Sequence, residues 1–304
     1  KRKRHRQKNP TKEVVDQFMK EHDSTWLQEQ VELHRDFLAF RSIIGKPPIN
    51  WITFRDFWRR ATKIHPSNKL HAFHCLITLI CSPRVRDQVL FATFEALFRD
   101  YPQLSPSIVA SWDVAKLMSY LGTLGMDKNA ENVLKTSKMI VDQFFGHVPE
   151  CYLSLLSMPG VGPKVANVMM YELFGRSTGI AMDVHLRRWF VILKWSTADK
   201  AEKVTQEIVE RILDHNYWGD MNRIYAGLGQ MLQENPLRLI DLARQHASPS
   251  VNHYIQMMYH TLKVDGGMDP KLVVIPVSLT ADDAANDDDA SNDMPIAGSG
   301  ANAN

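Results

Sequence analysis

Cysteine is scarce in this chain, and long apolar runs are missing from it. The 304 residues include three cysteines, Cys75, Cys81 and Cys151, too few for a disulfide framework or a four-cysteine metal cluster. Such sparse cysteine usage suggests a reducing compartment. The apolar runs, such as 76–81, are far shorter than the roughly 20 residues that span a bilayer. No apolar stretch follows the basic start, so we expect neither a signal peptide nor a membrane partner.

The net charge of +2 hides a very uneven distribution. Residues 1–12 carry seven Lys or Arg and no acid, whereas residues 265–304 carry eight Asp and one Lys. Both ends are predicted to be disordered arms around a helical domain of residues 13–264. Because that domain is nearly neutral, any binding surface on it must come from local placement of charge.

The basic arm also predicts a cellular address. A terminal block such as KRKRHR is typical of nuclear import signals and nucleic-acid tethers. Transit peptides are amphipathic and rich in Ser, and residues 1–12 contain neither Ser nor an apolar residue. We predict a nuclear protein, with a mitochondrial or plastid location as the alternative.

The alternation of apolar and polar residues that is typical of β-strands is missing too. One short stretch, LVVIPV at 272–277, could be extended, but Pro276 limits it. Apolar residues instead recur at helical spacing, which predicts an all-α fold. Helical spacing occurs around 14–19, 26–37 and 52–58, and longer helices are predicted at 70–81, 84–100, 114–121, 129–145, 151–158, 163–174, 184–194, 199–215, 221–232, 236–246 and 250–262. The helix at 70–81 is apolar nearly all round, so it should be buried.

A glycine hairpin is predicted between two helices within residues 155–174. Gly160 and Gly162, on either side of Val161, should allow a tight turn that a side chain would block. Pro163 suits the first position of the following helix, where its missing N–H costs nothing. The free N–H groups there suit one backbone phosphate, although a plain helix–helix turn would have the same sequence.

Lys164 and Asp183 carry the chemistry that the segment suggests. Lys164 lies in the first turn of a helix, where the dipole disfavours a cation by ~0.3–1 kcal/mol and can lower the pKa of an amine. A neutral amine is a nucleophile that can form a Schiff base at a sugar C1′. Asp183 fits the N-cap of the next helix, and its carboxylate could also stabilise positive charge or activate the lysine or a water. An ordinary surface lysine and an ordinary cap stay open as interpretations.

The sequence MPGVGPKVANVMMYELFG, followed by MDVH, resembles the helix–hairpin–helix (HhH-GPD) DNA glycosylase superfamily, and within it the endonuclease III branch. Upstream, LGTLGMDKNAENVLKTSKMIVDQFFGHVP and LITLICSPRVRDQVL are similar to segments of that family, so the resemblance covers roughly residues 70–235. It implies a two-lobed helical fold with damaged double-stranded DNA between the lobes and one base flipped out. It also implies that Lys164 is the Schiff-base nucleophile and Asp183 its partner.

The function that the resemblance implies is a bifunctional DNA glycosylase and apurinic/apyrimidinic lyase of base excision repair. It would act as a monomer on oxidised bases, above all pyrimidines. A monovalent cation at the hairpin is expected to help hold the phosphate. The residues expected to contact DNA are Gly160, Val161, Gly162, Arg84, Arg86, Met126 (as a wedge), His185, Arg187 and Arg188.

The chain departs from the family at the metal site. Many relatives carry a four-cysteine iron–sulfur cluster near the C-terminus, but no cysteine follows Cys151, so we expect no cluster and no other protein metal site. His71, His74 and Cys75 share a helix face, yet one helix supplies at most three of four zinc ligands, so we interpret them as core. The side chains expected to pack in place of the cluster are Leu228, Met231, Leu232, Leu237 and Leu239.

Three alternatives to this function stay open. The motifs LICS and DVH and the 19-residue step from Lys164 to Asp183 are also similar to those of 8-oxoguanine glycosylases. A monofunctional glycosylase for mismatched or alkylated bases would need only an activated water, so Lys164 argues against it. An inactive DNA-binding module would need neither residue.

Overall fold

The structure, a computed structural model, describes residues 10–44, 69–83, 85–124 and 127–264. Every regular element in these ranges is a helix, which confirms the all-α prediction. The predictions that lie outside the described residues are the basic arm to residue 9, the helical spacing at 52–58, Arg84, Met126, the stretch at 272–277 and the acidic arm.

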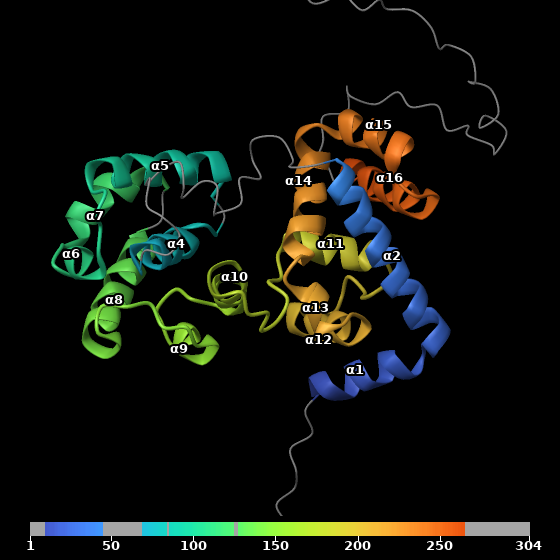
Figure 1. Cartoon of the computed structure of the whole chain (residues 1–304), viewed down its shortest axis with the longest axis horizontal. Helices are drawn as coiled ribbons and strands as arrows, with labels where there is room; N and C mark the ends of the chain where they lie inside the picture. The colour runs from blue at the N-terminus through green and yellow to red at the C-terminus, as the bar shows by residue number, and fades with distance from the viewer. Residues whose placement is uncertain (1–9, 45–68, 84, 125–126, 265–304) are drawn as a thin grey trace, which may run out of the picture. The chain divides into compact units, whose positions relative to one another are not determined.

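Figure 1 shows the described helices in chain order. The first part contains α1 (Pro10–Lys20), α2 (Ser24–Ile43), α4 (Lys69–Cys81), α5 (Asp87–Asp100), α6 (Pro106–Ala110), α7 (Val114–Leu121), the 3₁₀ turn η2 (Gly122–Leu124), α8 (Asp127–Phe144) and α9 (Tyr152–Leu156). The second contains α10 (Pro163–Phe174), α11 (Val184–Ile192), α12 (Glu202–Ile212), α13 (His215–Trp218), the π-helical turn η3 (Asn222–Ala226), α14 (Gly227–Glu234), α15 (Pro236–His246) and α16 (Pro249–Val264).

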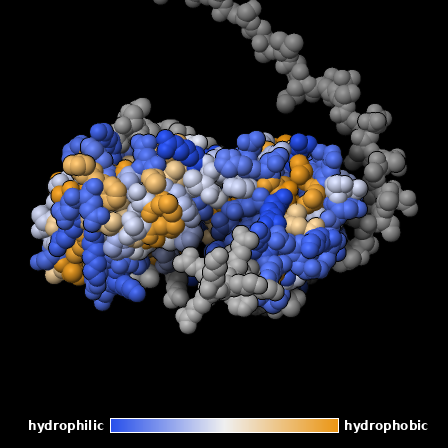
Figure 2. Space-filling model, turned by 90° about the horizontal axis from the view of Figure 1, so that it is seen from below, coloured by the Kyte–Doolittle hydropathy of each residue, from blue (hydrophilic) through white to orange (hydrophobic). Residues whose placement is uncertain are grey.

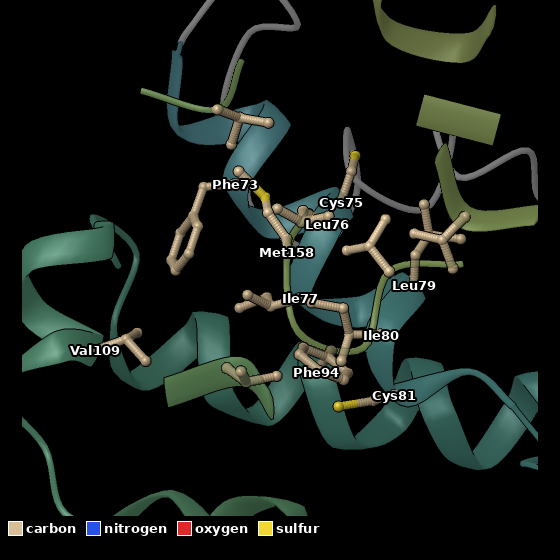
Figure 3. Close-up of a cluster of buried hydrophobic side chains, with 14 of the residues drawn as sticks. Phe73, Cys75, Leu76, Ile77, Leu79, Ile80, Cys81, Phe94, Val109 and Met158 are labelled. Atoms are coloured by element: carbon tan, nitrogen blue, oxygen red, sulfur yellow. The ribbon is translucent and has the colours of Figure 1, made fainter. Parts of the chain in front are cut away.

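One group of helices is built around α4, which is buried as its sequence predicts. Figure 3 shows Phe73, Leu79 and Cys81 leaving α4 on different sides. Helices α5, α8 and α10 all contact α4. The hairpin that leads into α10 therefore stands on a close-packed core, and such a base limits its movement.

A second group packs α2 against α12, α15, η3 and α16, and α11 contacts α12, α14, η3 and α16. Its aromatic centre includes the fully buried Trp189, Trp195 and Tyr225. Two buried polar contacts order this centre: His34 Nδ1 lies 3.1 Å from the Tyr225 hydroxyl, and Trp195 Nε1 donates to Gln30 Oε1 at 2.9 Å. Burial lowers the pKa of His34 to about 4, so its ring is neutral at physiological pH.

Helix α10 contacts both groups of helices. Its apolar side belongs to the α4 core, while the Tyr171 hydroxyl donates to Asp220 Oδ1 at 2.9 Å. Glu172 accepts two hydrogen bonds from Arg223, at 3.0 and 3.1 Å. The ring of Tyr171 packs directly on Gly219, where a Cβ atom would overlap it. These polar contacts fix the orientation of the helix that carries Lys164.

On the side that Figure 2 shows, hydrophilic residues predominate on the surface, and hydrophobic residues gather in small separate groups. Among the described helices, none combines the length and the apolar character that crossing a membrane requires.

Candidate active site

The hairpin between α9 and α10 depends on Gly160. This residue has φ of +80°, and a Cβ atom there would lie 2.9 Å from Ile80 Cγ2 and 3.0 Å from Asn132 Cβ. The Val161 N–H donates to the Met158 carbonyl at 3.1 Å and closes the turn. The prediction that a side chain would block the turn is therefore right for Gly160.

The same prediction is wrong for Gly162. Its φ of −99° is open to any residue, and a Cβ atom there would meet nothing within 4 Å. Gly162 serves instead as the N-cap of α10. Glycine there keeps the approach to the first helical amides open.

Substitution by alanine should affect stability differently at the two glycines. Gly160→Ala is expected to lower the free energy of unfolding by about 1–3 kcal/mol, because a left-handed backbone and two close contacts oppose the methyl group. Gly162→Ala is the matched control and should stay within about 0.5 kcal/mol of the parent. Denaturant unfolding monitored by circular dichroism measures both, and equal losses would contradict this assignment.

The first turn of α10 presents unpaired backbone donors. The first intrahelical bond runs from the Ala166 N–H to the Gly162 carbonyl at 3.0 Å, so the N–H groups of Lys164 and Val165 precede the ladder. No side chain among the described residues caps this terminus. Such a terminus is suited to an anionic ligand.

Lys164 and Asp183 lie together at this terminus. Lys164 Nζ is 3.9 Å from Asp183 Oδ2, with side chains 47% and 13% exposed. Asp183 is also the N-cap of α11, because its Oδ1 accepts the Leu186 N–H at 2.8 Å. Asp183 is thus the predicted cap through one oxygen, and its other oxygen faces the amine.

His185 borders this pair. Burial lowers the pKa of His185, the positive charges of Arg188 and Lys164 lower it further, and Asp183 opposes them. The imidazole packs against Gly229 of α14, where a Cβ atom would lie only 2.6 Å from Nδ1. His185 is therefore neutral near pH 7. Sequence reasoning missed Gly229, although a glycine inside a helix is a signal of close packing.

The predicted arginines have different surroundings. Arg188 is half-buried beside His185, whereas Arg86 is exposed at the start of α5. Arg187 Nη2 donates to the carbonyls of Ala198 and Lys200, at 2.9 and 3.3 Å. Its guanidinium thus holds the loop after α11, a role that the sequence does not suggest.

The histidines of α4 belong to the core. His74 Nε2 lies 2.7 Å from the Leu104 carbonyl, and its ring stacks on Phe98 with centroids 4.2 Å apart. Cys75 Sγ is 3.8 Å from His71 Nε2. Within the described ranges, no group of three or more His, Cys, Asp or Glu side chains could hold a metal ion.

The segment expected to replace the cluster packs mostly as predicted. Leu228, Met231, Leu232 and Leu239 are at most 5% exposed. Leu237 is 45% exposed, so its prediction as a packing residue is wrong. It is the second residue of α15, where Pro236 turns inward instead.

A helical fold with a glycine hairpin, a lysine at the following helix terminus and an aspartate facing it defines the helix–hairpin–helix class. Residues 77–214 match the family described as HhH-GPD superfamily base excision DNA repair protein. This part of the chain is therefore similar to that superfamily, and its relatives include endonuclease III-like proteins.

Two relatives illustrate the likeness. Endonuclease III-like protein 1 of Bos taurus is 28% identical over 166 residues, which cover 54% of each protein. Endonuclease III of Thermotoga maritima is 29% identical over 184 residues, which cover 59% of this chain and 84% of the bacterial protein. The chain thus spans about half the length of the bovine relative.

Solved structures share the fold. A non-covalent endonuclease III–DNA complex matches with a TM-score of 0.58 and 18% identity, over 76% of this chain and 97% of that one. A trapped endonuclease III–DNA covalent intermediate matches with a TM-score of 0.51 and 22% identity, over 62% and 90%. At these identities the likeness concerns the fold alone.

Proposed function

We propose that the protein is a monomeric DNA glycosylase of base excision repair that also cleaves the strand as an apurinic/apyrimidinic lyase. The observation that carries this proposal is the 3.9 Å pair of Lys164 and Asp183 beside the Gly160 hairpin. The pair is what a Schiff-base mechanism needs, and an inactive DNA-binding module would need neither side chain. The match of residues 77–214 to the HhH-GPD family supports it.

The proposed reaction begins with a base flipped out of the duplex, at a cost of a few kcal/mol that damage makes smaller. The Lys164 amine, after losing a proton, attacks C1′, and the bond from C1′ to the base breaks. The base leaves with the bonding electrons and takes up a proton. Asp183 stabilises the positive charge that develops at the sugar. The attacking nitrogen loses a proton, and the C1′–O4′ bond of the resulting aminal then breaks as O4′ takes up a proton, which opens the sugar ring and gives a protonated Schiff base. The Schiff base acidifies C2′, whose proton is lost as the C3′–O bond breaks and releases the phosphate.

The hairpin would hold the backbone next to the flipped nucleotide. The amides that precede the α10 ladder can donate to one phosphate oxygen each. The hairpin sequence at 158–163 contains no carboxylate, so the hairpin itself would offer a cation only backbone carbonyl oxygens. A monovalent cation fits such a neutral donor set, and its charge would help to balance the phosphate.

Borohydride trapping on duplexes with single lesions tests the function. With an oxidised pyrimidine we expect a covalent protein–DNA adduct and, without borohydride, a cleaved strand. Adduct formation with 8-oxoguanine alone would reassign the substrate. Base excision without any adduct would indicate a monofunctional enzyme, and binding without excision an inactive module.

We propose that Arg84, Arg86, Arg187 and Arg188 form a basic rim for the DNA. Arg188→Ala is expected to reduce the slope of log affinity against log salt concentration by about 1, the value for one lost phosphate contact. Arg244→Ala on α15 is the control, an exposed arginine in the last turn of a helix away from the hairpin. Equal slopes for the two variants, measured by fluorescence anisotropy, would remove Arg188 from the rim.

We also propose a nuclear location, on the strength of the seven basic residues at 1–12. A fluorescent fusion of the full chain should concentrate in nuclei, and a fusion lacking residues 1–8 should not. Among the relatives, endonuclease III homolog 2 of Arabidopsis thaliana is named chloroplastic, and it is 27% identical over 220 residues. An organellar signal from the full chain would therefore overturn the nuclear proposal in favour of the organellar alternative.

A further inference from the structure

The loop at 175–183 joins the helix of Lys164 to the helix that Asp183 caps. It forms no helix, yet Ile180, Ala181 and Met182 are at most 6% exposed. Buried backbone groups outside regular structure need partners from elsewhere. The source of those partners determines where Asp183 lies.

Asn167 supplies partners from α10. Its side chain is 2% exposed, Nδ2 donates to the Ile180 carbonyl at 3.3 Å, and Oδ1 accepts from Thr178 Oγ1 at 2.9 Å. Asn167 follows Lys164 by three residues, so both leave the same side of the same helix. The helix that carries the amine thus also holds the loop that delivers the carboxylate.

Glu210 supplies the partner from α12. Its Oε1 accepts the Ile180 N–H at 2.8 Å and is held by Gln206 Nε2 at 2.8 Å. Ile180 is therefore bonded on both sides, its carbonyl to Asn167 and its N–H to Glu210. We call Asn167 and Glu210 the loop clamp.

Gly179 lets the loop clamp close. It is buried, and a Cβ atom there would lie 3.0 Å from Asn167 Nδ2, Gln206 Nε2 and Glu210 Oε1. Any side chain at 179 would push these polar groups away from Ile180. The absence of a side chain at Gly179 thus leaves room for the two hydrogen bonds of the loop clamp.

We propose that Asn167 and Glu210 are positioning residues that set the separation between Lys164 and Asp183. The inference rests on the proposed function. The clamp grips Ile180, three residues before Asp183, so its loss would let the carboxylate drift from the amine. A displacement of about 1 Å at reacting groups can cost on the order of 10² in rate.

Single-turnover kinetics on a lesion duplex measure the effect. Asn167→Leu is expected to slow adduct formation by about 10²-fold, with affinity for DNA nearly unchanged. Glu210→Leu should act in the same direction. Glu210→Gln should restore the parent rate, because its amide oxygen still accepts the Ile180 N–H.

A buried polar residue elsewhere controls for general loss of stability. Gln30 is 7% exposed and accepts from Trp195 in the α2 group, so Gln30→Leu removes a comparable buried amide. It should lower stability without slowing the folded protein. Equal slowing by Gln30→Leu and Asn167→Leu would overturn the positioning role.

A double-mutant cycle separates positioning from support of the fold. If Asn167 acts through Asp183, adding Asn167→Leu to Asp183→Asn should cost less than about 3-fold more, because the group to be positioned is already gone. A further 10²-fold loss would mean that Asn167 acts independently of Asp183, and the proposal would be wrong.

Hydrogen exchange tests the positioning role of the loop clamp without reference to activity. The Leu186 N–H is protected by its bond to Asp183, so Asn167→Leu should speed its exchange while Gln30→Leu should not. If the parent forms no adduct on any lesion, the proposed function is wrong. The exchange rate of the Leu186 N–H then tests by itself whether the loop clamp positions Asp183. Unchanged exchange in Asn167→Leu overturns the positioning role.

Discussion

Replacing Lys164 with glutamine is expected to abolish borohydride trapping and strand cleavage while the fold stays intact. The amine is the proposed nucleophile, and an amide nitrogen cannot form a Schiff base. Glutamine is polar and a good helix former, and the position is 47% exposed, so stability should change by under ~1 kcal/mol. Trapping gels and circular dichroism measure the two parts of this expectation.

Lys203 offers a matched control for that variant. It is the second residue of α12, as Lys164 is of α10, and its Nζ also lies 3.9 Å from a carboxylate, that of Glu207. Lys203→Gln should trap and cleave like the parent. A Lys164→Gln protein that still forms the adduct would show that another amine is the nucleophile.

The sequence predicts the bounds of α10 to the residue because each end carries its own signal. Gly162 and Pro163 mark the start, and Gly175, with φ of 63°, gives the left-handed C-cap that ends the helix. The positions of Lys164 and Asp183 follow from the same local rules. A lysine in a first turn and an aspartate at an N-cap each depend only on neighbouring residues.

Local rules fail where the hydrogen-bond partner of a residue comes from a distant segment of the chain. Asn167 looks like any polar residue inside a helix, and its partner Ile180 is bonded to a glutamate 30 residues further along the chain. Nothing in the sequence around Arg187 indicates that its guanidinium donates to the carbonyls of Ala198 and Lys200. Neither arrangement has a spacing rule, since tertiary packing alone brings the partners together.

Short helices are missed by sequence-based prediction for a different reason. Helix α6 is only five residues long, and no helix was predicted there because so short a stretch shows no periodicity. Its signals were capping ones: Ser105 accepts the Ile108 N–H, and Pro106 takes the first position. The predicted helix at 199–215 likewise ends early, because Leu213 turns extended and α13 starts anew at His215.

Asp183→Asn should keep the helix cap and lose most of the turnover. Asparagine caps a helix about as well as aspartate, so its side-chain oxygen can still accept the Leu186 N–H and stability should hardly change. What disappears is the negative charge 3.9 Å from Lys164. Loss of such electrostatic stabilisation costs on the order of 10²–10³ in rate, which single-turnover assays resolve.

Asp113 shows what a cap alone contributes. It caps α7 by accepting the Lys116 N–H at 2.7 Å, in the same arrangement as Asp183 on α11. Asp113→Asn should therefore match the parent in both stability and rate. If the Asp183 variant were as active as the Asp113 variant, Asp183 would be a cap and nothing more, and Lys164 would need another group to stabilise the charge that its attack creates. A rate loss at Asp183 alone, with both proteins equally stable, assigns the difference to the oxygen that faces the amine.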